Sequence, residues 1–152
     1  MQHIWSVLCQ NSIIDKDTNL FSLNNCIEEL SIDIDRSKMP EPQKDKIVIP
    51  IEFNIVNFWI DDDTTKERKF FVEIDLIDPD NKTLNTTSAE YIMKKGVKRF
   101  RNRIKAQGLS ITKDGRYWFK IKMKEKKKDK FKEVGELPLD INISYKILDK
   151  IK

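Results

Sequence analysis

The sequence is short of the residues from which most catalytic and cofactor sites are built. Its 152 residues include one histidine, His3, four glycines and two cysteines. No glycine stands in a G-x-G or phosphate-loop pattern. If residues 3–9 form one strand, His3 and Cys9 lie roughly 20 Å apart, which excludes a Cys–His dyad. We therefore expect a protein that is not an enzyme and binds no cofactor, although a serine or cysteine acting with another base stays open.

Metal sites are also disfavoured. One histidine and two cysteines without C-x-x-C spacing cannot complete a four-ligand zinc site. Asp15, Asp17 and Asn19 imitate the start of an EF-hand loop. That loop requires glycine where Leu20 stands and glutamate where Cys26 stands, so the motif fails.

Five further aspartates suggest calcium binding by loops at one end of a sandwich. They are Asp61, Asp62, Asp63, Asp78 and Asp80. If 50–60 and 69–78 pair as a hairpin, however, the first three lie at its turn and the last two at its far end, about 25–30 Å away. Ordinary solvated turns are therefore the preferred interpretation, and we expect no metal.

Neither a disulfide framework nor a membrane segment is indicated. Cys9 and Cys26 are too few for a disulfide-built secreted domain, so we expect free, buried thiols in a reducing compartment. The first 14 residues lack a basic start, an uninterrupted apolar stretch and a small-residue cleavage site. Nowhere do 18 apolar residues run together. The sequence therefore predicts a cytoplasmic protein without a membrane partner.

What the sequence has in quantity is apolar and polar residues alternating with a period of two, which is typical of half-buried strands. The expected strands are 3–10, 20–34 with a bulge between Ile27 and Leu30, 47–60, 69–78, 97–105, 116–124, and one or two within 131–147. Residues 83–93 fit a short strand or a helical turn. A loop is expected at 35–46, where prolines and charges break both helix and strand.

Many short strands with no helices between them predict an all-β fold. We expect one domain over 1–152, an antiparallel β-sandwich of about eight strands with a C2-like or immunoglobulin-like Greek key. The expected core is centred on Phe70, Val72, Ile74, Leu76, Tyr117, Phe119, Ile121, Leu139 and Ile141.

Several segments carry a resemblance to a known group of proteins. They are HIWSVLCQNSIID, TNLFSL and EEL near the start, then GRYWF and ELPLDI. Together they resemble an uncharacterised bacterial family of small domains with a Trp-Ser-x-Leu-Cys first strand, a Gly-x-Tyr-x-Phe strand and a closing Pro-Leu strand. The resemblance spans most of the chain and implies a β-sandwich. It implies no activity and no functional residue.

Charge is distributed very unevenly along the chain. Residues 1–93 contain 9 Lys and Arg against 18 Asp and Glu, whereas residues 94–132 contain 17 against 3. On strands 97–105 and 116–124, alternate residues share one outer face. The candidate nucleic-acid-binding residues on these two rows are Arg99, Arg101, Arg103, Lys105, Trp118, Lys120, Lys122 and Lys124. Two cationic rows with an aromatic between them could follow a phosphate backbone and stack a base.

The basic region also allows three alternatives to nucleic-acid binding. Acidic outer positions such as Glu52, Glu73 and Asp75 could neutralise the rows. Residues 124–132 could be a lysine-rich hairpin loop that keeps a sheet edge soluble. Residues 97–106 also have the spacing of a short basic amphipathic helix, which would favour a membrane surface or an acidic partner.

The leading functional hypothesis is a non-catalytic binding or scaffolding module. Its partner would be another protein or a second copy of the chain, because an acidic first part and a basic later part suit self-association. The alternative is a nucleic-acid-binding protein that uses a basic sheet face within 94–132. A hydrolase of unknown type ranks third.

Overall fold

The chain folds almost entirely into β-strands. The structure is a computed structural model that describes residues 1–35 and 46–146. Within these residues there are nine strands: β1 (Gln2–Ile14), β2 (Phe21–Cys26), β3 (Glu29–Asp35), β4 (Ile47–Ile60), β5 (Arg68–Ile77), β6 (Thr83–Met93), β7 (Arg99–Ile111), β8 (Gly115–Lys124) and β9 (Lys132–Lys146). The loop predicted at 35–46 and the end of the last predicted strand fall mostly or wholly outside the described residues.

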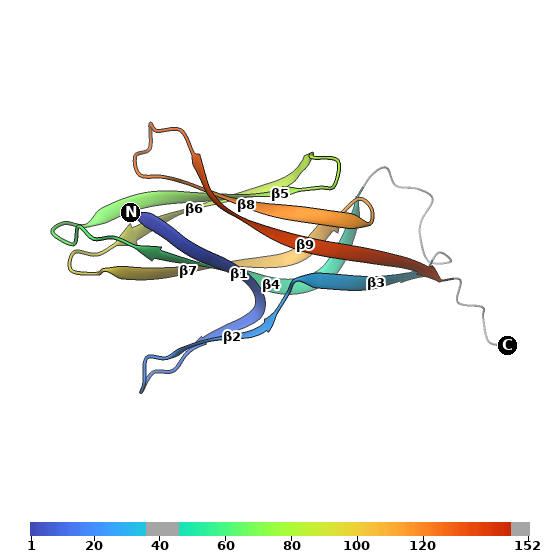
Figure 1. Ribbon diagram of the computed structural model, residues 1–152, viewed down its shortest axis with the longest axis horizontal. Helices are drawn as coiled ribbons and strands as arrows, with labels where there is room; N and C mark the ends of the chain where they lie inside the picture. The colour runs from blue at the N-terminus through green and yellow to red at the C-terminus, as the bar shows by residue number, and fades with distance from the viewer. Residues whose placement is uncertain (36–45, 147–152) are drawn as a thin grey trace.

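Two sheets make up a sandwich-like fold (Figure 1). Sheet A has four strands in the order β2-β1-β4-β7, and sheet B has five in the order β3-β9-β8-β5-β6. The all-β, two-sheet prediction is therefore confirmed. In the described part of the chain, no helix has the length and apolar character that a membrane crossing requires.

The core lies between the inner faces of the two sheets. All nine residues expected at its centre are buried, from Phe70 at 0% exposure to Leu76 at 6%. They come from β5, β8 and β9 of sheet B, and sheet A adds Phe53, Ile55 and Trp59 of β4. Period-two alternation predicted these faces correctly because a strand turns successive side chains to opposite sides.

The sheets are not purely antiparallel, which corrects one part of the sequence-based expectation. β3 pairs with β9 in parallel, whereas every other strand pair in the described residues is antiparallel. Residues 20–34 were expected to form one bulged strand, but β2 lies in sheet A and β3 in sheet B. The change of parity after Ile27 marks the point where the chain crosses between sheets.

The hairpin of 50–60 with 69–78, which was a condition for the expected placement of the aspartates, does not form. β4 belongs to sheet A and β5 to sheet B, so the loop between them crosses the sandwich. β5 pairs instead with β6 and β8. Pro50 lies inside β4, where the pairing with β7 shifts register between Ile49 and Glu52, as expected of a residue that cannot donate to a ladder.

Residues 99–111 form a strand, β7, which excludes the helical alternative for this part of the predicted 97–106 segment. β7 pairs with β4 along nearly its whole length, from Ile111 opposite Ile47 to Arg99 opposite Ile60. Phe100 and Ile104 face the core as expected. Asn102 shares that inner face, and its side-chain oxygen accepts a hydrogen bond of 2.6 Å from the indole nitrogen of Trp59.

The turn from β7 to β8 is held by one buried tyrosine. The hydroxyl of Tyr117, near the start of β8, accepts hydrogen bonds from the backbone nitrogens of Thr112 (2.8 Å) and Lys113 (3.1 Å). It donates to the carbonyl oxygen of Lys113 at 2.8 Å. The side chain thereby fixes the point at which the chain passes from sheet A to sheet B.

Candidate functional site

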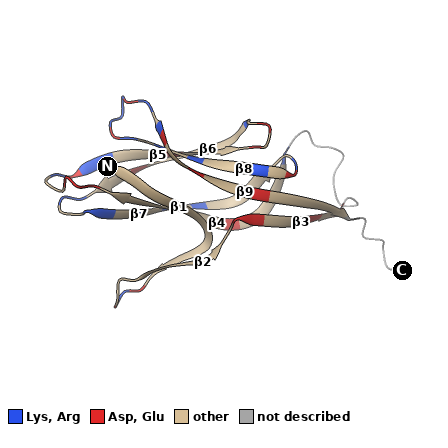
Figure 2. Ribbon diagram, viewed as in Figure 1, with Lys and Arg blue, Asp and Glu red and all other residues tan. Residues whose placement is uncertain are grey.

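The structure separates the two cationic rows that the sequence placed on one face. Arg99, Arg101, Arg103 and Lys105 lie on β7 of sheet A, whereas Trp118, Lys120, Lys122 and Lys124 lie on β8 of sheet B. Both rows point away from the core, so they lie on opposite outer faces of the sandwich. Figure 2 shows the two basic segments on different strands of different sheets.

The row on β8 is neutralised by its neighbours. Lys120 lies 3.3 Å from a carboxylate oxygen of Glu133 on β9. Lys122 forms ion pairs with Glu73, at 3.3 Å, and with Asp75, both on β5. The expectation that acidic outer positions compensate the basic rows is thus confirmed on sheet B.

The rest of the β8 row is occupied by aromatic and main-chain contacts. Lys124 lies over the rings of Phe131, at 4.5 Å, and Phe71, at 5.6 Å. Its ammonium also donates to the carbonyl oxygen of Lys127 at 3.0 Å. Residues 125–131 form a lysine-rich hairpin loop as expected, but β8 and β9 are interior strands, so the loop protects no sheet edge.

Asp75 of β5 is a buried carboxylate whose ion pair with Lys122 of β8 stabilises sheet B. Only 7% of Asp75 is exposed. Burial by itself raises the pKa of this carboxyl, but hydrogen bonds from Lys122 and from the Thr86 hydroxyl (2.6 Å) bring it below its ordinary value. The Lys122–Asp75 pair is therefore part of the packing and is not free to bind a partner.

The row on β7 has a different environment. Lys105 pairs with Glu52 of β4 at 3.1 Å. Arg101 lies over the rings of Phe21, at 4.9 Å, and Phe58, at 5.1 Å. Arg99 and Arg103 are exposed, and neither guanidinium has an ion pair or hydrogen bond with any other described residue.

Sheet A offers almost no acid to balance this row. Strands β1 and β2 contain no Asp, Glu, Lys or Arg. β4 contains one acid, Glu52, and that acid is the partner of Lys105. Three arginine charges therefore stay uncompensated on this sheet. We call the residues Trp5, Phe21, Phe58, Arg99, Arg101 and Arg103 the arginine face.

Three aromatic side chains support the arginine face from the neighbouring strands. Trp5 of β1 stands opposite Phe58 of β4, with ring centroids 5.4 Å apart. Phe21 of β2 stacks on Trp5 at 6.3 Å. Because Arg101 covers both phenylalanine rings, these aromatic faces are already in contact with protein. They hold the guanidinium in place.

The β1–β2 hairpin borders the arginine face. It projects from the body of the molecule (Figure 1), and its tip exposes large apolar side chains, namely Ile13, Ile14 and Leu20. A pocket of about 330 Å³ lies between this hairpin and β7, lined by Ser12, Ile14, Phe21, Val56, Arg101, Asn102 and Arg103. A ligand in this pocket would meet two guanidinium groups and an apolar wall.

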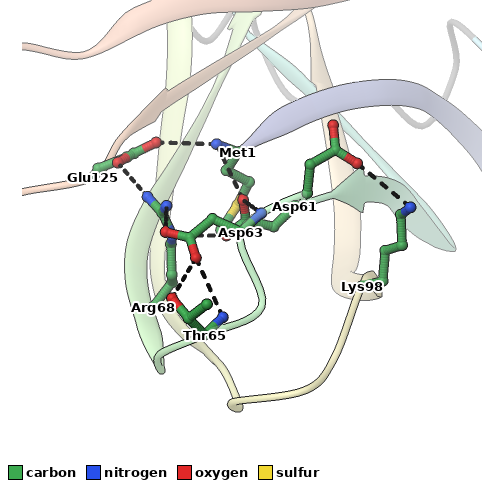
Figure 3. Close-up of polar contacts among 8 residues, drawn as sticks. Met1, Asp61, Asp63, Thr65, Arg68, Lys98 and Glu125 are labelled. Carbon is green, nitrogen blue, oxygen red and sulfur yellow. Dashed lines mark hydrogen bonds and ion pairs between the residues drawn. The ribbon is translucent and has the colours of Figure 1, made fainter.

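The aspartates considered for calcium lie at opposite ends of the sandwich. Asp61 and Asp63 lie at the start of the loop after β4, and both contact Arg68, at 2.7 Å each (Figure 3). Asp78 and Asp80 follow β5, where Asp80 pairs with Lys113. Among residues 1–35 and 46–146, no group of three or more His, Cys, Asp or Glu side chains is arranged to hold a metal.

Arg68 lies at the centre of a cluster of charged side chains (Figure 3). Besides its two aspartates, Arg68 lies 3.3 Å from Glu125. Hydrogen bonds from Thr65 to the carboxylate of Asp63, with Arg68 beside it, lower the pKa of Asp63 to about 2. Each acid of the cluster shares this guanidinium, so the group closes the loop rather than offering a free site.

Sequence reasoning missed a polar chain inside the sandwich. The Oγ of Ser6 lies 2.7 Å from Nε2 of His3 and donates to the side-chain oxygen of Asn57 at 2.5 Å. His3 Nδ1 lies 3.1 Å from the carbonyl oxygen of Val134 on β9. The three-residue spacing of His3 and Ser6 gave no signal because a register shift between His3 and Trp5 brings them together.

This set of hydrogen bonds links β1 of sheet A to β9 of sheet B. Burial lowers the pKa of His3, and the hydrogen bond to Val134 opposes that effect. The imidazole also packs so closely on Gly135 that a Cβ there would lie 2.7 Å from His3 Cε1. Gly135 is therefore explained by a close approach across the two sheets.

The two cysteines are both free, as expected, but only one is buried. Cys9 has 0% exposure, whereas Cys26 is exposed. They are opposite each other in the β1–β2 ladder. Burial raises the pKa of the Cys9 thiol, so it is protonated at neutral pH.

Comparison with known proteins gives no assignment. No protein-family model matches the chain, and no curated protein is significantly similar to it. The resemblance to an uncharacterised bacterial family stays a prediction.

Proposed function

We propose that the protein is a non-catalytic binding module that holds an acidic segment of a partner polypeptide against its arginine face. One observation carries the proposal: Arg99 and Arg103 have no counter-charge among the described residues, whereas every basic side chain on β8 has a carboxylate partner or an aromatic one. Exposed cations without an intramolecular partner favour association with an anionic surface.

The choice of arginine supports a carboxylate partner. The chain has 6 arginines against 23 lysines, yet three of the arginines fall within residues 99–103. Lysine would serve solubility equally well. Arginine adds a planar fork that holds a carboxylate with two parallel hydrogen bonds, which a lysine cannot do.

Nucleic acid is the alternative partner, and the arrangement of the aromatic rings argues against it. Base stacking requires exposed rings beside the cations. Arg101 covers Phe21 and Phe58, and Trp118, the aromatic of the other row, lies on the opposite sheet. A single row of arginines would still attract phosphates, so nucleic acids belong in the same test.

The strand order also supports a proposal for the topology of this module. We suggest an immunoglobulin-like Greek key, in which β1-β4-β7 take the places of strands A, B and E, and β9-β8-β5-β6 those of G, F, C and C′. Support comes from Tyr117, whose hydroxyl bonds back to the backbone of residues 112 and 113 at the turn between the two sheets. Immunoglobulin-like domains place a tyrosine in this way at their E–F corner.

The test is a binding titration with a matched pair of variants. Fluorescent ten-residue peptides of alternating Asp and Ser, or of Lys and Ser, are titrated by anisotropy at two salt concentrations, beside single- and double-stranded DNA and RNA. We expect the acidic peptide to bind. The variant R99E/R103E should weaken that binding about tenfold or more, since two attractions become two repulsions.

The control variant is K126E/K128E, which makes the same charge change in the loop between β8 and β9 and should bind like the wild type. Salt-steep binding of DNA or RNA without peptide binding would replace the proposal by the nucleic-acid alternative. No binding of any probe at low salt would overturn both. A dimer in light scattering that R99E/R103E dissolves would identify the acidic partner as a second copy.

A further inference from the structure

The seam between β6 and β7 is where the sandwich is open. Each of these strands is the last of its sheet, and they run next to one another (Figure 1). At one end, rings from both sheets close the seam: Tyr91 of β6 lies 5.8 Å from Phe100 of β7, and both contact Phe70. Toward Asn85 and Gly108, no pair of rings from the described residues of β6 and β7 bridges the two strands.

A pocket of about 220 Å³ occupies the open end of the seam. Side chains of both sheets line it, and its apolar residues include Phe53, Ile74, Leu76, Leu109 and Phe119, all of which belong to the core. The pocket therefore gives a visiting side chain access to the core.

The edge of β7 is available for pairing. In the described part of the chain β7 pairs with β4 alone, and on its other side sheet A ends. Immunoglobulin sheets of the constant type continue past this position with a fourth strand, D. Here a short connection, residues 94–98, joins β6 to β7, so no strand of the described chain takes that place.

Edge strands often carry cations simply to block pairing with other chains. Lysine usually serves that purpose, but β7 carries three arginines in alternate positions on one face. β6, the other free edge of the seam, contains no Lys, Arg or Pro. The distribution of arginine thus distinguishes β7 from a merely protected edge.

We propose that the partner segment docks as an added β-strand on the free edge of β7. Its acidic residues, at alternate positions, face Arg99, Arg101 and Arg103, and the apolar residues between them turn inward to the seam pocket. Successive side chains of a strand point to opposite faces, and those on the same face recur about every 6.6–6.8 Å, so one strand meets both surfaces. The inference rests on the proposed function for the acidic side of this pattern.

The positions of the arginines and of the pocket along β7 determine which partner sequence would fit this edge. The edge from Arg99 to Gln107 is nine residues, about 30 Å of extended chain. Acidic residues are required opposite the arginines at 99–103. An apolar side chain is required beside Ala106, where β7 borders the pocket. The class of ligand is therefore an extended peptide of about nine residues with alternating acidic and aliphatic side chains.

Four ten-residue peptides test the added strand. The first alternates Asp with Val, and the second alternates Asp with Gly. The other two are isomers of the Asp-Val peptide, methylated on the backbone nitrogens of all Asp in one and of all Val in the other. In a strand one of these sets faces β7 and the other faces solvent, so the two isomers control for each other.

We expect Asp-Val to bind at least tenfold more tightly than Asp-Gly, and one methylated isomer to lose binding at least tenfold while the other keeps it. Equal binding of both isomers, with loss in R99E/R103E, would overturn the added strand and leave the acidic-partner function standing. No binding of any peptide would overturn both. Loss in both isomers would place the peptide backbone elsewhere and also contradict the proposal.

A variant of the protein provides a second readout. Ala106→Leu fills the pocket from β7 and should remove the preference for Val over Gly while leaving the binding of Asp-Gly unchanged. Its thermal unfolding midpoint is measured beside that of the wild type to show that it folds. A folded Ala106→Leu protein that still prefers Asp-Val tenfold would show that the seam pocket does not receive the side chain.

Discussion

Strand β7 of sheet A and strand β8 of sheet B carry four cations each but use them differently. On sheet B, Lys120 and Lys122 reach carboxylates of neighbouring strands. On sheet A, Arg99 and Arg103 reach no carboxylate of the described residues. The reason is composition: β3, β5 and β9 bring acids to sheet B, whereas the strands of sheet A contain a single acid, Glu52.

This difference shows that an excess of charge in sequence is not an excess in space. Residues 94–132 hold 17 basic residues against 3 acidic ones, yet on β8 acids from β5 and β9 pair with Arg116, Lys120 and Lys122. Among the cations of β7 and β8, only Arg99 and Arg103 are exposed with neither a carboxylate nor an aromatic ring of the described residues beside them. Neutralised charges contribute to the fold, and the others are available for binding.

The largest effect should come from breaking the sheet B network. Lys122→Met leaves the carboxylate of Asp75, 7% exposed, without its ion pair. We expect the free energy of unfolding to fall by about 2 kcal/mol, since a buried charge is left with its desolvation cost. Urea denaturation at pH 7 measures it. The double variant with Asp75→Asn should recover part of the loss, and a loss below about 0.5 kcal/mol in Lys122→Met would contradict the comparison.

The second-largest effect should come from the tyrosine hydroxyl that holds the turn from β7 in sheet A to β8 in sheet B. Tyr117→Phe removes the hydroxyl that bonds to the backbone at residues 112 and 113. We expect a loss of about 1–2 kcal/mol, because three backbone groups lose a partner and water can replace it only at the exposed side of the turn. Chemical denaturation measures the loss. An unchanged midpoint would remove the main support for the immunoglobulin-like corner.

A smaller effect should appear with pH. The pKa of His3 is lowered by burial from its ordinary 6.5, so below that pH the unfolded chain binds a proton that the folded chain resists. Stability should therefore decrease as pH falls from about 6.5 toward the folded pKa, and His3→Gln should flatten this dependence. NMR of the chain's one histidine gives its pKa directly. A folded pKa above 6.5 would contradict the prediction.

The smallest effect should come from the arginine face. Arg103→Met removes a charge comparable to that of Lys122, but Arg103 has no ion pair with a described residue. We expect its unfolding free energy to change by less than about 0.5 kcal/mol. Denaturation beside Lys122→Met gives the direct comparison. A loss as large as that of Lys122→Met would mean that Arg103 serves the fold.

The core and the strand faces were predictable because they depend on local alternation. Tyr117, Phe119 and Ile121 face inward whichever strands lie beside β8, since the pleat alone sets their direction. The crossover after Ile27 was interpreted as a bulge because both produce the same change of parity. Pairing partners depend on contacts far apart in sequence, such as those of β3 with β9.

The candidate site was predicted in its parts but not as a whole. Arg99, Arg101 and Arg103 were expected on one outer face, and the structure places them there. Phe21, Phe58 and Trp5 were not associated with them, because their approach depends on the register of three strands. The separation of the β7 and β8 rows depends on which sheet each strand joins.

The sequence by itself determined that the chain is β-rich, which side chains face the core and which strands are basic. These properties follow from residue type and a period of two. Only the tertiary structure decided which cations meet acids, that β7 ends its sheet beside an open seam, and that Ser6, His3 and Asn57 meet inside the sandwich. The physical reason is that ion pairs, sheet edges and buried polar contacts depend on distances between strands, and strand order sets those distances.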